Sequence, residues 1–110
     1  MKIARIIAKH KDAGVESADK IVILCGLDSS NRIVEGEWMG YCFTDGLHSP
    51  FILRKKKELF FGDEENYYEV TNLNDKCLSV GEYFTASNHP GDHEQFHSSY
   101  QITDLNVISG

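Results

Sequence analysis

The sequence has few cysteines, and their spacing matches neither a disulfide framework nor a zinc knuckle. Cys25, Cys42 and Cys77 stand far apart in a chain of 110 residues, and no Cys-x-x-Cys pair occurs. Disulfide-stapled domains carry an even, dense set of cysteines, and structural zinc sites use closely spaced pairs. We therefore expect three reduced thiols.

Long apolar runs are absent as well. No stretch approaches the roughly 18 apolar residues of a membrane-spanning helix. The opening segment MKIARIIAKHKD lacks the apolar region and cleavage site of a signal peptide. These features predict a cytoplasmic protein with no membrane partner. A length of 110 residues and a hydrophobic fraction of 41% predict one domain over residues 1–110 with one modest core.

Positive charge is scarce. Eleven basic residues face seventeen acidic ones, for a net charge of −6. Such a balance opposes binding to a phosphate backbone and favours a basic protein partner.

Two motifs that carry catalysis are also missing. There is no Gly-x-x-x-x-Gly-Lys-Ser/Thr loop for phosphates and no Gly-x-Ser-x-Gly elbow. We assign no catalytic residue and expect no cofactor. An enzyme that binds a small ligand in the mouth of a barrel remains an alternative.

What the chain does contain is a series of short apolar and alternating runs separated by turn residues. Helical periodicity is weak: Ile3, Ile6 and Ile7 fit a helix face, but Ile3, Arg5 and Ile7 also alternate as in an edge strand, which we favour. Strands are expected over 2–9, 20–27, 36–43, 49–61, 67–73, 78–87 and 98–108. Because closure removes exposed edges, we predict an all-β fold, a small closed or partly open antiparallel β-barrel of about six to seven strands.

Two of these strands have unusual patterns. The segment 36–43 places Trp38, Gly40 and Cys42 on one face, and three further apolar side chains on the other. The segment 49–61 is interpreted as one long strand with a charged middle.

Two heptads, 33–39 and 78–84, share the pattern apolar-x-x-Gly-Glu-aromatic-apolar. Glycine tolerates positive φ where a chain bends sharply into a strand. The heptads therefore suggest equivalent corners, although two unrelated strand entries could share this pattern by chance.

The segment VILCGLDSSNRIVEGEWM (22–39) resembles the core hairpin of the second-domain β-barrel of elongation factor Tu-like translational GTPases. Gly26 and Gly36 take the two glycine positions, ten residues apart, and Ile33, Glu37 and Met39 match the second strand. The resemblance implies a barrel of similar shape. It implies no GTP chemistry, because that belongs to another domain of the family, but it raises RNA or ribosomal components as an alternative class of partner.

Three histidines gather in SNHPGDHEQFH (87–97), where His89, His93 and His97 are spaced four apart. On a helix this spacing would align them as metal ligands, but Pro90-Gly91 opposes a helix. A metal site in this loop, supporting a metal-dependent enzyme, is one hypothesis. A solvated loop is the other.

Two charged clusters are candidate binding residues. Lys55, Lys56 and Lys57 form the only basic cluster together with Arg54, and would carry RNA affinity if the chain binds RNA. The acidic cluster consists of Asp63, Glu64, Glu65 and Glu69 and would contact a basic protein. The function that we favour is a non-catalytic protein-binding module, for example an inhibitor or an immunity-type antitoxin.

Overall fold

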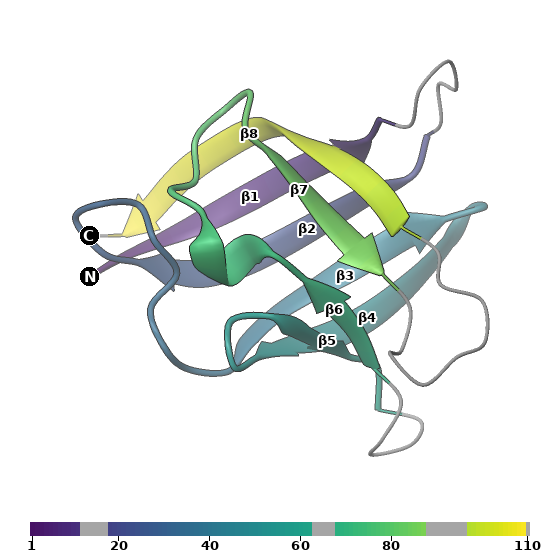
Figure 1. Ribbon diagram of the computed structural model, residues 1–110, viewed down its shortest axis with the longest axis horizontal. Helices are drawn as coiled ribbons and strands as arrows, with labels where there is room; N and C mark the ends of the chain where they lie inside the picture. Colours follow the sequence, from purple (N-terminus) through teal and green to yellow (C-terminus); the bar gives the residue numbers. More distant parts are fainter. Residues whose placement is uncertain (12–17, 63–67, 88–96, 110) are drawn as a thin grey trace.

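The computed structural model describes residues 1–11, 18–62, 68–87 and 97–109. Figure 1 shows that most of this backbone is β-strand. The elements are β1 (Lys2–His10), β2 (Lys20–Leu27), β3 (Trp38–Thr44), β4 (Leu47–Arg54), β5 (Glu58–Phe60), β6 (Tyr68–Thr71), the 3-10 helix η1 (Leu73–Asp75), β7 (Tyr83–Ser87) and β8 (His97–Ser109).

The strands form a closed barrel. Each strand pairs antiparallel with its neighbours in the chain, and β1 also pairs with β8, which closes the ring. Two register shifts between β1 and β8, after Ile3 and after Ile7, are of the kind that bends a strand around a barrel. The predicted all-β class and the antiparallel barrel are confirmed, including β1 as a strand.

The structure has eight strands rather than six or seven, because the expected strand over 49–61 is a hairpin. β4 ends at Arg54 and β5 begins at Glu58, which pairs back with Arg54. Lys55 and Lys56 have φ of 55° and 62°, so the chain reverses there. Sequence rules missed this turn because lysine seldom adopts the left-handed conformation that a tight hairpin needs.

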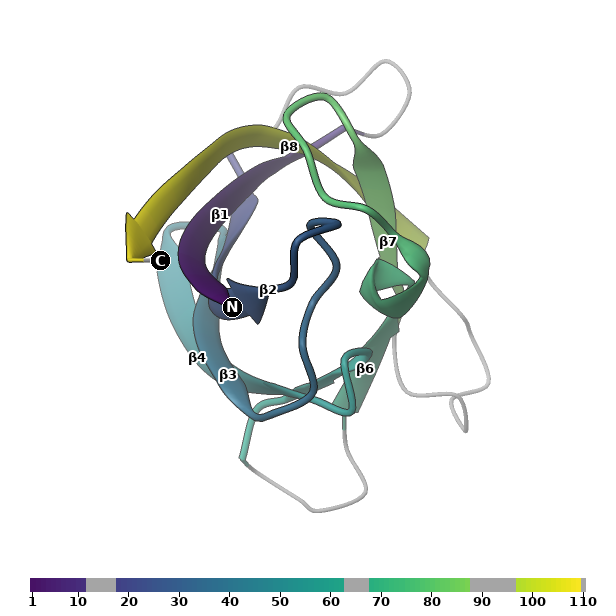
Figure 2. The same ribbon diagram turned by 90° about the vertical axis from the view of Figure 1, so that its left-hand side faces the viewer.

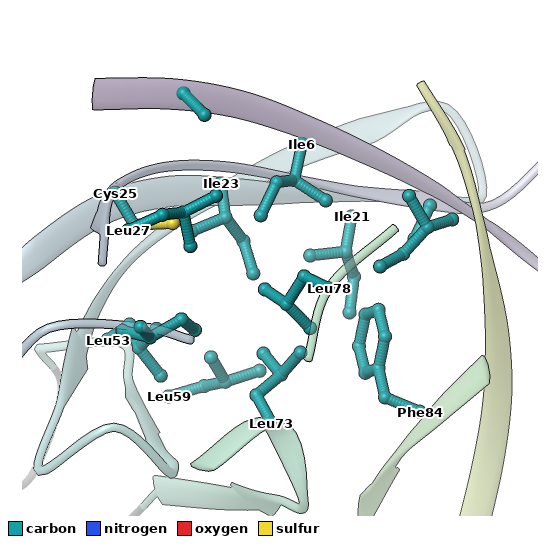
Figure 3. Close-up of a cluster of buried hydrophobic side chains, with 14 of the residues drawn as sticks. Ile6, Ile21, Ile23, Cys25, Leu27, Leu53, Leu59, Leu73, Leu78 and Phe84 are labelled. Carbon is teal, nitrogen blue, oxygen red and sulfur yellow. The ribbon is translucent and has the colours of Figure 1, made fainter. Parts of the chain in front are cut away.

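The core lies inside the barrel and alternates with outward residues along each strand. On β1 the inward side chains of Ala4 and Ala8 are small, and larger side chains from the facing strands fill the space. Figure 3 shows this cluster. Its fully buried large side chains are Ile6, Ile21, Ile23, Leu27, Leu53, Leu59, Leu73, Leu78, Phe84 and Ile102.

One end of the barrel is covered by two connections. The segment between β2 and β3 runs across the ring of strands (Figure 2) and buries Ile33. The segment between β6 and β7 buries Leu73 and Leu78. Asn31 joins the two segments: its carbonyl oxygen accepts the Leu78 N–H at 2.8 Å, and its Nδ2 donates to the Leu78 carbonyl at 3.1 Å.

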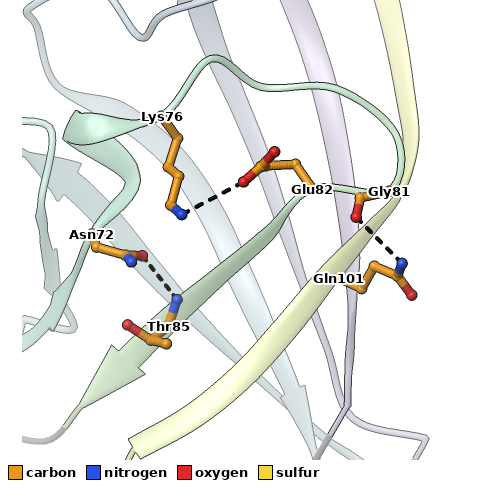
Figure 4. A network of polar contacts seen from close by, with 6 residues as sticks. All are labelled: Asn72, Lys76, Gly81, Glu82, Thr85 and Gln101. Carbon is orange, nitrogen blue, oxygen red and sulfur yellow. Dashed lines mark hydrogen bonds and ion pairs between the residues drawn. The ribbon is translucent and has the colours of Figure 1, made fainter.

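The segment between β6 and β7 is also held by polar contacts with β7 and β8 (Figure 4). The Thr85 N–H donates to Asn72 Oδ1 at 2.9 Å, and Lys76 Nζ lies 3.5 Å from Glu82 Oε1. Gln101 Nε2 donates to the Gly81 carbonyl at 3.3 Å. These contacts place Leu78 over the core although it belongs to no strand.

The two similar heptads play equivalent roles at this end. Ile33 and Leu78 open them and are both buried. Gly36 and Gly81 have φ of 152° and 97°. β3 and β7 then begin at Trp38 and Tyr83, two residues after each glycine.

Trp38 explains the two glycines of the segment 22–39. Its Nε1 donates to the Val34 carbonyl at 2.8 Å, and its ring lies against both Gly26 and Gly36. A Cβ atom at Gly26 would lie 2.6 Å from Met1 Sδ and 3.0 Å from the indole, and one at Gly36 would lie 3.1 Å from the indole. A side chain at either position would press on the ring.

Among the described residues, no helix is long and apolar enough to cross a membrane.

Candidate functional site

An apolar row crosses the outer surface of the barrel. Strand register places Met39 opposite both Leu24 and Ile52, and places Ile52 opposite Phe60. Residues directly opposite each other in antiparallel strands share a face. Met39 is 66% exposed and Leu24 is 43% exposed, so this face is the outer one.

The row opens into a groove over β3, β4 and β5. The groove has a volume of about 230 Å³, is open to solvent and has a mostly apolar lining. Its lining side chains include Met39, Pro50, Ile52, Phe60 and Phe61, and Gly62 forms part of the rim. Contiguous exposed apolar surface of this kind marks a place where another molecule binds.

Arg54 covers one side of this surface. Its guanidinium lies 4.2 Å from the centre of the Phe60 ring and 5.6 Å from that of Tyr68. Its Nε donates to Glu58 Oε1 at 3.0 Å. The Arg54 side chain is 18% exposed, so this cation and the ring beneath it are held in place.

An aromatic group continues the outer face towards the turn between β3 and β4. The His48 ring lies 4.8 Å from that of Phe43 and 5.1 Å from that of Tyr41, and Lys20 Nζ lies 5.9 Å from the Phe43 centroid. The outer surface of β3 therefore presents large apolar side chains along its whole length.

Sequence reasoning missed the groove as a site. A signal was present, because both faces of the segment 36–43 are apolar. An antiparallel strand with one solvated face normally alternates apolar and polar residues, so a second apolar face indicates a further contact.

Of the predicted acidic cluster, only Glu69 lies in the described part of the chain. Asp63, Glu64 and Glu65 lie outside the described residues. Glu69 pairs with the fully buried Leu59, so its side chain shares the inward face of the barrel. Strand register turns Glu69 inward, and its contact with a partner stays a prediction.

Burial changes the acidity of Glu69. Desolvation raises the pKa of this carboxyl above its ordinary value, since the charged form loses water. No hydrogen bond or ion pair from another described residue reaches the carboxylate. Glu69 is therefore a destabilising feature of the barrel interior at neutral pH.

The Glu69→Gln substitution is expected to raise the free energy of unfolding at neutral pH. A carboxyl whose folded pKa exceeds its unfolded pKa makes the folded state lose stability as pH rises through the interval between the two values. Glutamine has no ionisable side chain, so the variant does not lose this stability as pH rises. The gain should be absent below the unfolded pKa and complete above the folded one, which urea unfolding from about pH 4 to about pH 8 would measure.

Glu35→Gln is the control for this experiment, because it removes the same charge from an exposed position between β2 and β3. An equal gain for both variants at neutral pH would mean that general charge repulsion, and not burial of Glu69, is responsible.

The buried thiols are unsuited to nucleophilic chemistry. Burial raises the pKa of both Cys25 and Cys42 to about 12, and the Glu69 carboxylate adds to the shift at Cys42. A thiolate is the reactive form, so neither thiol is activated at neutral pH. The third cysteine, Cys77, is exposed and free.

The predicted metal ligands fall largely outside the described chain. His89 and His93 lie there, and His97 is the first residue of β8. Within the described ranges, no group of three or more histidine, cysteine or acidic side chains could hold a metal ion. The metal hypothesis for His89, His93 and His97 stays a prediction.

The basic cluster lies at the turn between β4 and β5. Because Lys55, Lys56 and Lys57 do not form a strand, they do not alternate between two faces as expected, but share one turn. Lys55 Nζ lies 3.8 Å from Glu58 Oε2, and its side chain is 72% exposed.

Comparison of the chain with protein-family models, curated proteins and solved structures found no match. The resemblance of residues 22–39 to the second domain of elongation factor Tu-like GTPases therefore stays a prediction.

Proposed function

We propose that this chain is a non-catalytic protein-binding module whose docking face is the apolar outer surface of β3, β4 and β5. The observation that carries the proposal is the groove between Met39, Ile52 and Phe60, on a face where Met39 is 66% exposed. Covering such surface releases water from apolar atoms and favours association. An inhibitor or immunity-type role fits a module of this kind.

The filled barrel supports an outer site over an inner one. Side chains from seven of the eight strands, all except β6, and from both end connections pack inside the barrel, and Figure 3 shows this buried cluster. Small barrels that bind ligands internally keep space there. Here a hollow with a mostly apolar lining lies over β3, β4 and β5.

A protein partner fits this face better than nucleic acid does. Single-stranded nucleic acid stacks its bases on open aromatic faces. Here the Phe60 ring already carries the Arg54 guanidinium at 4.2 Å, and aliphatic side chains such as Met39 and Ile52 line the groove. The net charge of −6 also opposes a polyanion.

A reducing compartment suits this module. Cys25, Cys42 and Cys77 are all free thiols, and Cys77 is exposed. Exposed free thiols persist in the cytoplasm and are oxidised outside it, which supports a cytoplasmic location.

The Met39→Asp substitution is expected to abolish binding of the partner protein. A carboxylate in the centre of an apolar contact must lose its water without gaining a partner, which weakens affinity roughly tenfold or more. Tagged wild-type and variant chains would be incubated with lysate of the source cells, with and without nuclease, and the captured proteins compared by mass spectrometry.

Leu47→Asp is the matched control. Leu47 is 70% exposed, close to the 66% of Met39, and does not line the groove. A partner that resists nuclease, is lost with Met39→Asp and is kept with Leu47→Asp supports the proposal. A partner that survives Met39→Asp, or that disappears with nuclease, contradicts it.

A further inference from the structure

The turn at the end of the β4–β5 hairpin has an unusual sequence for its shape. Lys55 and Lys56 both have positive φ, and the Lys57 N–H donates to the Arg54 carbonyl at 3.2 Å. A β-turn with positive φ at both central residues strongly favours Asn-Gly there, because a side chain with a Cβ is strained in that conformation. Folding alone therefore does not account for the lysines, and strained residues of this kind point to a function.

The turn lies in line with the groove. β4 runs from the groove residues Pro50 and Ile52 through Arg54 to the turn. Lys55 is three positions after Ile52, or about 10 Å along the strand. A short extended segment bound in the groove would therefore reach the lysines.

The turn carries more positive than negative charge among the described residues. Glu58 is shared, because its two carboxylate oxygens approach Arg54 and Lys55. Within the described ranges, Lys56 and Lys57 have no acidic partner. All eleven basic residues of the chain lie in the described ranges, whereas seven of the seventeen acidic residues lie outside them.

We infer that the groove and the lysine turn together bind a protein segment in which apolar side chains are followed by carboxylates. The apolar side chains would cover Met39, Ile52 and Phe60, and the carboxylates would meet Lys55, Lys56 and Lys57. This inference rests on the proposed docking face, and it assigns an acidic partner where composition alone favours a basic one. Complementary charge beside an apolar contact sets orientation and partner choice.

The test uses three pools of fluorescein-labelled peptides. Each peptide has a run of mixed leucine, isoleucine, valine and phenylalanine, followed by three glutamates, three glutamines or three lysines. Binding is measured by fluorescence anisotropy at low salt to the wild type and to Lys55→Asn/Lys56→Gly. Asn-Gly suits the turn, so this variant should show a raised Tm, which separates loss of binding from loss of fold.

Lys9→Gln/Lys11→Gln is the charge control, because it removes two exposed lysines near the end of β1, three strands from β4. The wild type and this control should bind the glutamate pool about fivefold to tenfold more tightly than the glutamine pool. Lys55→Asn/Lys56→Gly should lose that preference, and Met39→Asp should lose all three pools.

Four results would overturn the inference. They are equal binding of the glutamate and glutamine pools, a preference for the lysine pool, a glutamate preference that persists in Lys55→Asn/Lys56→Gly, and no binding of any pool. An RNA oligonucleotide that displaces the peptides would also overturn it, in favour of a nucleic-acid surface. The capture experiment with Met39→Asp tests the proposed docking face independently of the peptides. A failure of the inference about the lysine turn can therefore be distinguished from a failure of the docking face.

Discussion

Gly40→Ala is expected to lower the free energy of unfolding by about 3 kcal/mol, at the upper end of the cost of overpacking a core. A Cβ atom at position 40 would lie 2.3 Å from the Val22 carbonyl oxygen and 2.7 Å from Cζ of Phe51. The first contact is with backbone, which cannot move without disturbing the pairing of β2 with β3. Urea unfolding followed by circular dichroism would measure the loss.

The control for this prediction is Gly62→Ala. A Cβ at Gly62 would meet nothing within 4 Å, and only its φ of 92° disfavours alanine. The control should cost about 1 kcal/mol from the backbone alone. In an extended strand alanine is ordinarily no worse than glycine, so a Gly40→Ala variant as stable as the wild type would contradict the close approach of β3 to β2 and Phe51.

Leu78→Ala is expected to lower the free energy of unfolding by about 3 kcal/mol, as for other fully buried leucines. Leu78 belongs to no strand, yet it has 0% exposure and contacts the core over one end of the barrel (Figure 3). Hydrogen bonds with Asn31 hold its backbone, so the connection cannot easily collapse into the cavity that alanine would leave. Thermal and urea unfolding would measure this loss.

Val80→Ala is the matched control, because Val80 lies two residues further along the same connection and is 62% exposed. It should change stability by no more than about 0.5 kcal/mol. Equal effects of the two substitutions would mean that this connection does not close the barrel.

Both predictions bear on the docking face. Gly40 lies on β3 between Met39 and Tyr41, and its lack of a side chain lets β3 approach Val22 of β2 closely. The filled core and the closed end make the barrel a rigid support. A rigid support lowers the entropic cost of binding at its surface.

The two candidate sites, the lysine turn and the groove, differ in how well the sequence predicts them. The cluster Lys55 to Lys57 is evident in the sequence, but its shape was predicted wrongly, because a charged run between apolar residues also fits a strand. The two apolar faces of 36–43 signalled a further contact, but the sequence could not locate the groove. It combines side chains from three strands and the segment that follows β5, and only the strand register brings Met39, Ile52 and Phe60 side by side.

The sequence by itself determined the all-β class and most strand positions. Alternation and short β-branched runs such as 20–27 report the local pleat of the backbone, and this signal needs no knowledge of the partner strand. The glycines of the two heptads likewise marked where strands begin.

Only the tertiary structure decided which face of each strand is buried. Both faces of 36–43 are apolar, and the pairing of Cys42 with Ile21 turns Gly40 and Cys42 inward and leaves Met39 outside. The pairing of Glu69 with Leu59 likewise turns a carboxylate into the barrel. Alternation repeats every two residues but does not specify which of the two faces is buried. A shift of register by one residue exchanges the inside and the outside face, and long-range pairing alone selects between them.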